Sequence, residues 1–413
     1  MIPLRLDEVA ALAAGRLTTA PGAWEISGVK VDSRRIEPGD LFVAIHRGVD
    51  HVDDAVARGA AATLIPEEPF AAMAALGHAV RERSSARVVG ITGSTGKTST
   101  KDILAALCAP SAKTIAAEAS YNNEIGVPLT LCRLDPGTEV CVLELAMRGF
   151  GQIAELCKIA RPEIGVVTNV GPAHLELVGS LDGVLRAKGE LVAGLPPGGT
   201  AIVPEGFPVD RDDITVVRLT EQDVSFEEDA AVVGGVRFNV TSRHQATNAA
   251  AALAALDVLG LPRPESVEVD FSRWRGEEVE LPGGGLLVND AYNANPVSMR
   301  AALVYLAERA GERRRVAVLG EMAELGSGAP EFHREIGQEA ARLGIDVLVA
   351  VGELARGYLD GAGEVPVTKW VANAAAAVPA AKAVVEPGDC VLVKASRAVG
   401  LEVVAETLAA VRA

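Results

Sequence analysis

The sequence has 413 residues, a formal net charge of −16 and 49% hydrophobic residues, of which few are aromatic. A chain of this length exceeds what a single hydrophobic core supports, so we expect two or three domains, and the Gly- and Ala-rich composition favours helices packed on sheets. The acidic charge excludes a general nucleic-acid binder, because neutralising phosphates needs a basic face and the longest basic run is Arg313 to Arg315.

The cysteine pattern and the hydropathy pattern both favour a cytoplasmic protein. Five cysteines are spread along the chain without a CxxC pair, which is typical of buried thiols in a reducing compartment. The first residues carry Arg5, Asp7 and Glu8, so they form no signal-peptide core. No apolar run is long enough to cross a bilayer, and we therefore expect no membrane insertion.

The first predicted domain spans residues 1–84. Its apolar periodicity predicts short elements of a small α/β domain, namely a helix over 6–14 and strands over 28–31, 41–45 and 60–65. The charged stretch from Arg81 to Ser85 is predicted to be a linker.

The second predicted domain spans residues 85–271. A continuous apolar strand over 88–91 enters a glycine-rich turn and then a helix over 102–107, which is how a buried parallel strand leads into a phosphate-binding loop. Helical patterns separate the further strands, and this alternation predicts a doubly wound P-loop sheet. Those strands are expected over 140–145, 164–169 and 201–203.

The third predicted domain spans residues 272–413 and repeats the α/β alternation, which predicts a Rossmann-like fold. The irregular segment 270–285, with Pro282 and three consecutive glycines, is the predicted hinge. Strands are expected over 286–289, 316–320, 347–352 and 390–393, and helices over 299–309 and 331–343.

One segment carries a clear chemical signal. Glycines bring backbone N–H groups against phosphate oxygens at a helix N-terminus, Lys97 would meet the β and γ phosphates, and the Thr98 hydroxyl would hold Mg²⁺. A GKT triplet alone is weak, but its strand–turn–helix context favours a nucleotide site over a structural turn. The predicted cradle is Gly93, Ser94, Thr95, Gly96, Lys97, Thr98 and Ser99.

The same loop and the motifs around it resemble the Mur ligase family. The similarity covers nearly the whole chain, although Thr95 stands where the family often has asparagine. It implies an ATP-dependent amide ligase that activates a carboxylate as an acyl phosphate. The Tyr292 to Pro296 motif resembles the branch that adds D-alanyl-D-alanine to UDP-N-acetylmuramoyl-tripeptide. The motifs lie at 32–34, 38–44, 91–98, 121–130, 144–148, 169–176, 290–299 and 393–397.

The resemblance also implies a metal and activation centre with ATP and two Mg²⁺ ions. Glu144, at the end of a predicted strand, would bind Mg²⁺ beside Thr98. His174 would bind a second ion, although a lone histidine is more often structural. Lys188 looks like a surface helix lysine, yet the matching family residue is carbamylated. Only a neutral amine reacts with CO₂, so the hypothesis requires a desolvated Lys188 with a lowered pKa.

Further binding residues follow from the same resemblance. Asn248 would contact adenine, and Arg275 and Asp290 would reach the ATP phosphates and ribose. Asp32, Ser33 and Arg34 would hold the uridine diphosphate end, where an arginine pairs well with phosphate. Without the resemblance this triplet is only a turn. The remaining substrate candidates are Asn122, Asn123, Tyr292, Asn293, Asn295, Lys394 and Arg397.

Two alternatives stay open on the sequence. One is another amino-acid ligase of the same family, such as the enzyme that adds the third residue, or a folylpolyglutamate synthase. The other is a P-loop switch that hydrolyses nucleotide to change partners, which would leave Glu144, His174 and Lys188 unexplained. We also expect small-molecule substrates, a monomer, and closure of the domains about residues near 84 and 272 that excludes water from the acyl phosphate.

Overall fold

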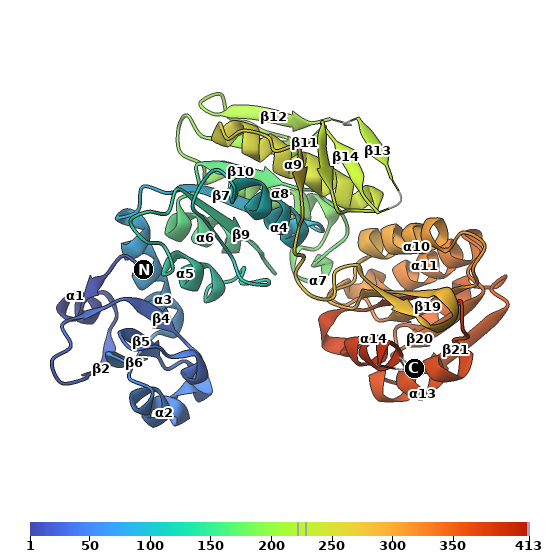
Figure 1. Cartoon of the computed structure of the whole chain (residues 1–413), viewed down its shortest axis with the longest axis horizontal. Coiled ribbons are helices and arrows are strands. Elements are labelled where there is room, and N and C mark those ends of the chain that lie inside the picture. The colour runs from blue at the N-terminus through green and yellow to red at the C-terminus, as the bar shows by residue number, and fades with distance from the viewer. Residues whose placement is uncertain (221–222, 228, 411–413) are drawn as a thin grey trace.

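The computed structural model describes residues 1–220, 223–227 and 229–410. Three groups of α/β elements follow one another along the chain, from blue through green to red in Figure 1. The α/β class with three sheet-based modules is therefore confirmed. Within the described residues, no helix combines the length and the hydropathy needed to cross a membrane.

The N-terminal module is built on a four-stranded sheet of order β2-β6-β5-β4, in which only the β2–β6 pair is antiparallel. A two-stranded ribbon of β1 and β3 lies beside it. The elements are β1 (Leu4–Arg5), α1 (Leu6–Leu12), β2 (Gly15–Thr19), β3 (Glu25–Ile26), β4 (Gly28–Lys30), β5 (Asp40–Val43), α2 (Val52–Ala57), β6 (Ala62–Pro66) and α3 (Pro69–Glu82).

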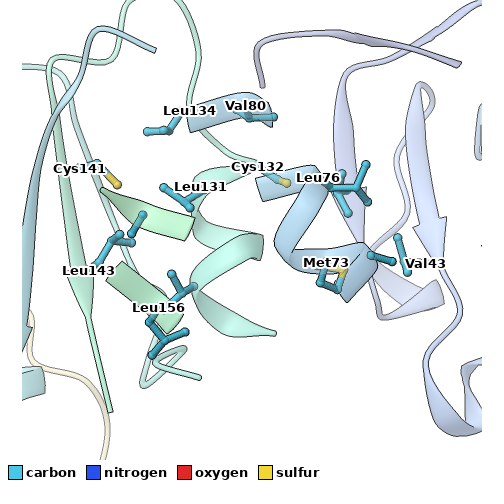
Figure 2. Close-up of a cluster of buried hydrophobic side chains, with 14 of the residues drawn as sticks. Val43, Met73, Leu76, Val80, Leu131, Cys132, Leu134, Cys141, Leu143 and Leu156 are labelled. Carbon is cyan, nitrogen blue, oxygen red and sulfur yellow. The ribbon is translucent and has the colours of Figure 1, made fainter. Parts of the chain in front are cut away.

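Helix α3 joins the N-terminal sheet to the centre of the molecule. Its buried residues Met73, Leu76 and Val80 form one cluster that continues to side chains of the central module, as Figure 2 shows. At Gly77 an added Cβ would lie 2.8 Å from the Cα of Pro128, so only glycine permits this close contact with helix α5 (Gly126–Leu131). The core is continuous here, which argues against a hinge near residue 84.

The central sheet has six parallel strands in the order β12-β11-β10-β7-β9-β8. One face packs against α5, α6 and α8, and the other against α4 and α9. The remaining elements are β7 (Arg87–Thr92), α4 (Lys97–Cys108), β8 (Thr114–Ala116), β9 (Val140–Glu144), α6 (Gln152–Ala160), β10 (Ile164–Val167), α7 (Leu175–Val178), α8 (Leu181–Ala193), β11 (Thr200–Pro204) and β12 (Thr215–Leu219).

A small four-stranded sheet of order β13-β14-β15-β16 covers helix α9 at the edge of the central module. Its short strands pack Phe238 and Val267 against the alanine-rich face of that helix. The elements are β13 (Val224–Phe226), β14 (Ala231–Val233), β15 (Val236–Phe238), α9 (Arg243–Leu259) and β16 (Ser266–Val267).

The C-terminal sheet has the order β17-β18-β22-β19-β20-β21, and all its strands are parallel except β17. Helices cover both faces, as a Rossmann-like fold requires. The elements are β17 (Glu277–Leu281), β18 (Gly285–Asp290), α10 (Pro296–Ala310), β19 (Arg315–Gly320), α11 (Ala329–Arg342), β20 (Val347–Val351), α12 (Arg356–Gly361), β21 (Val367–Val371), α13 (Ala374–Val384), β22 (Cys390–Lys394) and α14 (Glu402–Ala409).

Two connecting segments differ from their prediction. The expected irregular hinge 270–285 contains the edge strand β17, because Val279 and Leu281 alternate with glutamates and pack on the sheet. The expected linker 81–85 begins inside helix α3, and Arg81 donates to the carbonyl of Ala160 at 2.9 Å. The charged residues of 81–85 concealed the end of helix α3, and the glycines of 270–285 concealed strand β17.

The irregular segment between the central and C-terminal modules is therefore short. The Ser272 N–H donates to the carboxylate of Asp102 in α4 at 3.0 Å. Two residues later Trp274 has a left-handed φ of 61°, and its carbonyl accepts from the N–H of Tyr292 in the C-terminal module. The chain passes from one module's anchor to the other's within residues 272–274.

Candidate active site

The glycine-rich loop is fixed to the end of strand β10. The Ser94 hydroxyl donates to the Gly171 carbonyl at 2.9 Å and accepts from its N–H, while the Thr95 N–H donates to the side chain of Asn169. Gly93 and Gly96 have φ of 151° and 78°. An added Cβ on either would lie about 2 Å from a side-chain oxygen, of Thr168 and of Asn248 respectively.

Within the predicted cradle, some residues shape the loop and others can bind an anion. The backbone N–H groups of Ser94 and Thr95 bond to Asn169, so these two residues shape the loop rather than offer their N–H groups to a ligand. The first-turn N–H groups of α4, which begins at Lys97, have no acceptor within their own helix by geometry. These groups and the helix dipole provide the anion site.

A buried polar pair closes the floor of the loop. The Thr98 hydroxyl donates to one oxygen of Glu144 at 2.6 Å, and the Asn122 amide donates to the other at 2.8 Å. Glu144 is the last residue of β9, and both Thr98 and Glu144 are 1% exposed. Parallel strands deliver residues at their carboxyl ends to one edge, which is why Glu144 meets the loop that follows β7.

Two lysines lie near this carboxylate. Lys97 donates to the Gly93 carbonyl at 2.9 Å, and burial lowers its pKa. Lys188 in α8 is fully buried, and its Nζ finds no hydrogen-bond partner among the described residues. Burial, followed by the charge of Lys97, holds the pKa of Lys188 well below its usual value. The low pKa that carbamylation requires is therefore present.

His174 begins helix α7 with a left-handed φ of 55°. Its Nδ1 lies 2.5 Å from the carboxylate of Glu324, a residue of the C-terminal module that the sequence prediction did not include. The hydrogen bond from His174 lowers the pKa of Glu324. This pair bridges the two modules.

The C-terminal module contributes a wall that faces the loop. The Asn295 amide, which also caps α10, donates to the Ser94 carbonyl at 3.2 Å. The Tyr292 hydroxyl bonds to that of Ser120, and the Arg275 guanidinium lies 4.1 Å from the Tyr292 ring centroid. An added Cβ on Gly171 would lie 2.6 Å from the side chain of Val297, so the C-terminal module packs closely against this segment.

Four other predicted residues of this wall, Lys394, Asp290, Asn293 and Arg397, make contacts within the C-terminal module. Lys394 is 2% exposed and donates to the carboxylate of Asp290 at 2.6 Å and to the carbonyl of Asn293 at 2.8 Å. Arg397 lies over Trp274, 4.6 Å from its ring centroid. Lys394 therefore holds the Tyr-Asn-Ala-Asn loop in place, which favours a positioning role over direct substrate contact.

These residues surround one cavity of about 1180 Å³ between the central and C-terminal modules. Gly93, Lys188 and the triplet 32–34 are not among its lining residues. Of the predicted site residues, the cavity is lined by Ser94, Thr95, Gly96, Lys97, Thr98, Ser99, Asn122, Asn123, Glu144, His174, Asn248, Arg275, Asp290, Tyr292, Asn293, Asn295, Lys394 and Arg397.

The N-terminal triplet forms a self-contained turn. Asp32 accepts from the backbone N–H of Arg34 and forms a 2.8 Å ion pair with its guanidinium, which lowers the pKa of Asp32 to about 2. Arg34 is exposed, and the neighbouring Arg35 pairs with Glu118 on the central module at 3.0 Å. The turn thus lies beside the 117–123 loop that carries Asn122.

The sequence prediction missed a buried pair on helix α4. Lys101 is 2% exposed and donates to the carbonyls of Ala117 and Ala119 at 2.7 and 2.9 Å, so it fixes the start of the Asn122 loop. It also pairs with Asp102, which holds Ser272. The available signal was a lysine on the same helix face as Leu104 and Cys108.

A phosphate loop on an all-parallel sheet, facing a second Rossmann-like module across one cavity, defines a multidomain P-loop α/β protein. Family models match two regions: the Mur ligase middle domain at residues 91–215 and the Mur ligase glutamate ligase domain at residues 274–397. The chain belongs to the Mur ligase family.

Individual relatives agree with this assignment. The UDP-N-acetylmuramoyl-tripeptide–D-alanyl-D-alanine ligases of Mycobacterium tuberculosis and Escherichia coli are 36% and 31% identical to this chain, covering 92% and 99% of both chains. A crystal structure of MurF from Acinetobacter baumannii matches with a TM-score of 0.86, 28% identity and 99% coverage of each chain. MurF from Thermotoga maritima in complex with ADP matches with a TM-score of 0.76, 27% identity and coverage of 93% of this chain and 97% of that one.

Proposed function

We propose that this chain joins D-alanyl-D-alanine to UDP-N-acetylmuramoyl-tripeptide with consumption of ATP. The observation that carries the proposal is the buried Thr98–Glu144 pair beside Lys97, placed in a cavity shared with the C-terminal module. Relatives named for this reaction cover nearly the whole chain. A P-loop switch would need no such second module across the phosphate site.

The nucleotide would bind along helix α4. Its free N-terminal N–H groups would donate to oxygens of the β and γ phosphates, with Lys97 supplying the charge. Asn248, which touches Gly96 from helix α9, would face the adenine. Arg275, half-buried with its Nε lacking a partner in the described part of the chain, would approach the phosphates, and Asp290 the ribose. The complex of a relative with ADP supports ATP use.

The residues present fit Mg²⁺. Thr98 and Glu144 offer a hydroxyl and a carboxylate, and Mg²⁺ typically takes one or two carboxylates together with substrate phosphates. Within the described residues no group of three or more His, Cys, Asp or Glu forms a ready cage. A first ion at Thr98 and Glu144 and a second at His174 would stabilise the charge that develops on the transferring phosphoryl group.

Lys188 is proposed to be carbamylated. A buried amine without a hydrogen-bond partner is costly, and its lowered pKa leaves the nitrogen lone pair free to attack CO₂. The nitrogen bonds to the carbon of CO₂ and releases one proton to solvent, and the resulting carbamate is an anion that would be paired with the positive charge of Lys97 and the second ion. The modification thus converts an unfavourable group into a ligand.

The proposed reaction has two steps, both placed in this cavity. An oxygen of the tripeptide carboxylate attacks the γ-phosphorus, ADP leaves, and an acyl phosphate results. The amine of the dipeptide attacks the acyl carbon, loses a proton, and phosphate leaves. Holding both reactants in one cavity can supply about 7 to 11 kcal/mol of the barrier. The cavity walls would also exclude water from the acyl phosphate.

The other substrate groups are assigned by their position. Asp32, Ser33 and Arg34 would hold the uridine diphosphate end, and the 117–123 loop beside them would lead its peptide toward Glu144. The substrate wall would consist of Asn122, Asn123, Tyr292, Asn293, Asn295 and Arg397. Lys394 also lines the cavity and would hold Asn293 in place through its carbonyl.

We also propose module boundaries at residues 84 and 271. We further propose that the protein is a monomer and that it acts in the cytoplasm, where ATP is supplied. We place the closing motion at residues 272–274, because the core around α3 is continuous.

One coupled assay tests the function. Phosphate release is measured with ATP and UDP-N-acetylmuramoyl-tripeptide, with and without D-alanyl-D-alanine. We expect release to depend on the dipeptide and on Mg²⁺. Turnover indifferent to the dipeptide would contradict the proposal, and dependence on a single amino acid in its place would favour another ligase of the family.

A further inference from the structure

The contact between His174 and Glu324 links two modules at the edge of the cavity. Both side chains line that cavity, one from the start of α7 and the other from the loop 321–328 that follows β19. The Glu324 carbonyl also accepts from the N–H of Glu176 at 3.3 Å, so backbone and side chain meet the same short helix. The loop therefore grips α7 at two points.

Both residues have backbone conformations that most side chains avoid. The φ angles of His174 and Glu324 are 55° and 62°, and Gly326 has 61°. An added Cβ on Gly326 would lie 3.3 Å from the Cα of Glu176, so the close approach of loop and helix depends on glycine. Strained residues persist where the surrounding structure fixes them, and they concentrate at functional sites.

The loop that carries Glu324 is held from behind. His333, which is fully buried, accepts from the Met322 N–H at 3.0 Å and donates to the Ala329 carbonyl at 2.6 Å. The Ala323 N–H donates to the Ser396 hydroxyl at 2.9 Å. A carboxylate on such a support keeps its position relative to the C-terminal sheet.

The direction of the His174–Glu324 bond decides what the imidazole can do. A carboxylate only accepts, so the ring carries a hydrogen on Nδ1. In the neutral ring the lone pair is then on Nε2, which is the form that binds a metal ion. Histidine ligands commonly donate their second N–H to a carboxylate, which fixes the ring and raises its basicity.

We propose that Glu324 is a positioning residue that orients His174 for the second Mg²⁺ from across the module interface. The inference rests on the proposed function, since it needs the ion that the phosphoryl transfer would use. As a consequence, His174 is fully oriented as a metal ligand only when the C-terminal module is in place. The metal site and the part of the substrate wall that belongs to the C-terminal module are then assembled in one step.

Arg148 offers a competing explanation for the position of Glu324. Its Nε lies 3.8 Å from the second carboxylate oxygen, and its side chain is 76% exposed. An exposed pair at this distance contributes little, so the bond to His174 is the dominant contact. An Arg148→Gln variant should accordingly leave the metal affinity nearly unchanged.

The experiment is a double-mutant cycle on the full chain with Glu324→Ala, His174→Gln and the combined variant, plus Glu324→Gln as the conservative change. Glu353→Gln, an exposed acid of the same module paired with Arg356, is the matched control. Mn²⁺ affinity is measured by electron paramagnetic resonance in the presence of a non-hydrolysable ATP analogue, and kcat and KM are measured in parallel.

We expect Glu324→Ala to weaken the weaker Mn²⁺ site by about 10- to 100-fold and to lower kcat with little change in KM for ATP. Glu324→Gln should recover part of the loss, because its amide oxygen still accepts. In the His174→Gln background Glu324→Ala should add nothing. Unchanged Mn²⁺ affinity in Glu324→Ala, or an equal loss in both backgrounds, would overturn the inference. The binding cycle needs no dipeptide, so failure of the proposed reaction would be seen separately.

Discussion

The phosphate loop and the Asp32–Arg34 turn are both polar sites, but they are built in different ways. Around the loop, Thr98, Glu144 and Lys188 are buried and positioned by the central sheet. In the turn, Asp32 and Arg34 satisfy each other at the surface. The first site combines a buried, hydrogen-bonded carboxylate with a buried amine that has no hydrogen-bond partner in the described residues, whereas the second must exchange an internal ion pair for a ligand.

The difference indicates which step each site serves. Fixed dipoles and buried charges stabilise a transition state because they need no reorganisation when charge develops. A solvated ion pair reorganises easily and is suited to capturing an anionic ligand. Substitutions near the loop should therefore alter kcat, and those in the turn should alter KM.

Lys188→Met should give the largest effect. We expect a loss of about 100- to 1000-fold in dipeptide-dependent phosphate release, as for removal of one preorganised stabilising group. The same change removes a buried amine without a partner, so the melting temperature should be equal or higher. Calorimetry in the absence of bicarbonate compares the melting temperatures of the two proteins, and the phosphate-release assay measures the loss of activity.

Lys158→Met, on an exposed lysine paired with Glu155, is the control and should change neither property. Isotope-labelled bicarbonate should give a carbamate resonance in the wild-type NMR spectrum that Lys188→Met lacks. A resonance of the same intensity in both proteins would assign the carbamate to another group.

Arg34→Ala should show the opposite kinetic pattern. A charge-assisted hydrogen bond contributes about 1.5 to 3 kcal/mol, which corresponds to about a 10- to 100-fold rise in KM for the UDP-linked substrate. KM for ATP and kcat should stay near the wild-type values. Steady-state kinetics with each substrate varied in turn tests this prediction. A fall in kcat alone in Arg34→Ala would contradict the difference proposed between the turn and the phosphate loop.

Lys101→Met tests whether the interior of the central module positions the Asn122 loop. Removing Lys101 leaves the buried carboxylate of Asp102 without its cation and the carbonyls of Ala117 and Ala119 without this donor, which should cost about 3 kcal/mol of unfolding free energy. We expect kcat to fall about 10-fold, within the range for a displaced positioning group.

The exposed pair of Lys113 and Asp135 has a similar N–O distance of 2.6 Å and provides the matched control. Lys113→Met should lose only a small fraction of that stability, because solvent screens the pair. Denaturant unfolding of both variants measures the difference, and equal losses would contradict the importance given to burial.

Thiol labelling gives the smallest expected signal. All five cysteines are buried, and burial raises the pKa of Cys108, Cys132, Cys141 and Cys157 to about 12 and that of Cys390 to about 11. Since the thiolate reacts, native protein at neutral pH should bind less than one equivalent of a thiol reagent. Unfolded protein should bind five. Val49→Cys, at an exposed site of the N-terminal module, supplies a reactive reference.

The strands and helices that the sequence predicted were those with a strong local pattern. The apolar runs before Gly93, at 286–289 and at 316–320 correspond to β7, β18 and β19. Strand β17 was missed, because its glutamates, of which Glu277 lies on the same face as Val279 and Leu281, concealed the alternation.

The site was predictable to a similar extent. A loop signature lies within a few consecutive residues, so Lys97 and Thr98 could be identified from the sequence. Lys101 and Glu324 could not, since the carbonyls that accept from Lys101 lie 16 and 18 residues away in the chain and His174 lies 150 residues from Glu324.

The sequence by itself determined the phosphate loop, the α/β alternation and the resemblance to the Mur ligases, because each is written in short-range order along the chain. Only the tertiary structure decided that Lys188 is a buried amine rather than a surface lysine, that Asp32 and Arg34 pair outside the cavity, and that Glu324 reaches His174. The physical reason is that desolvation and ion pairing depend on distances in space, which sequence separation does not encode.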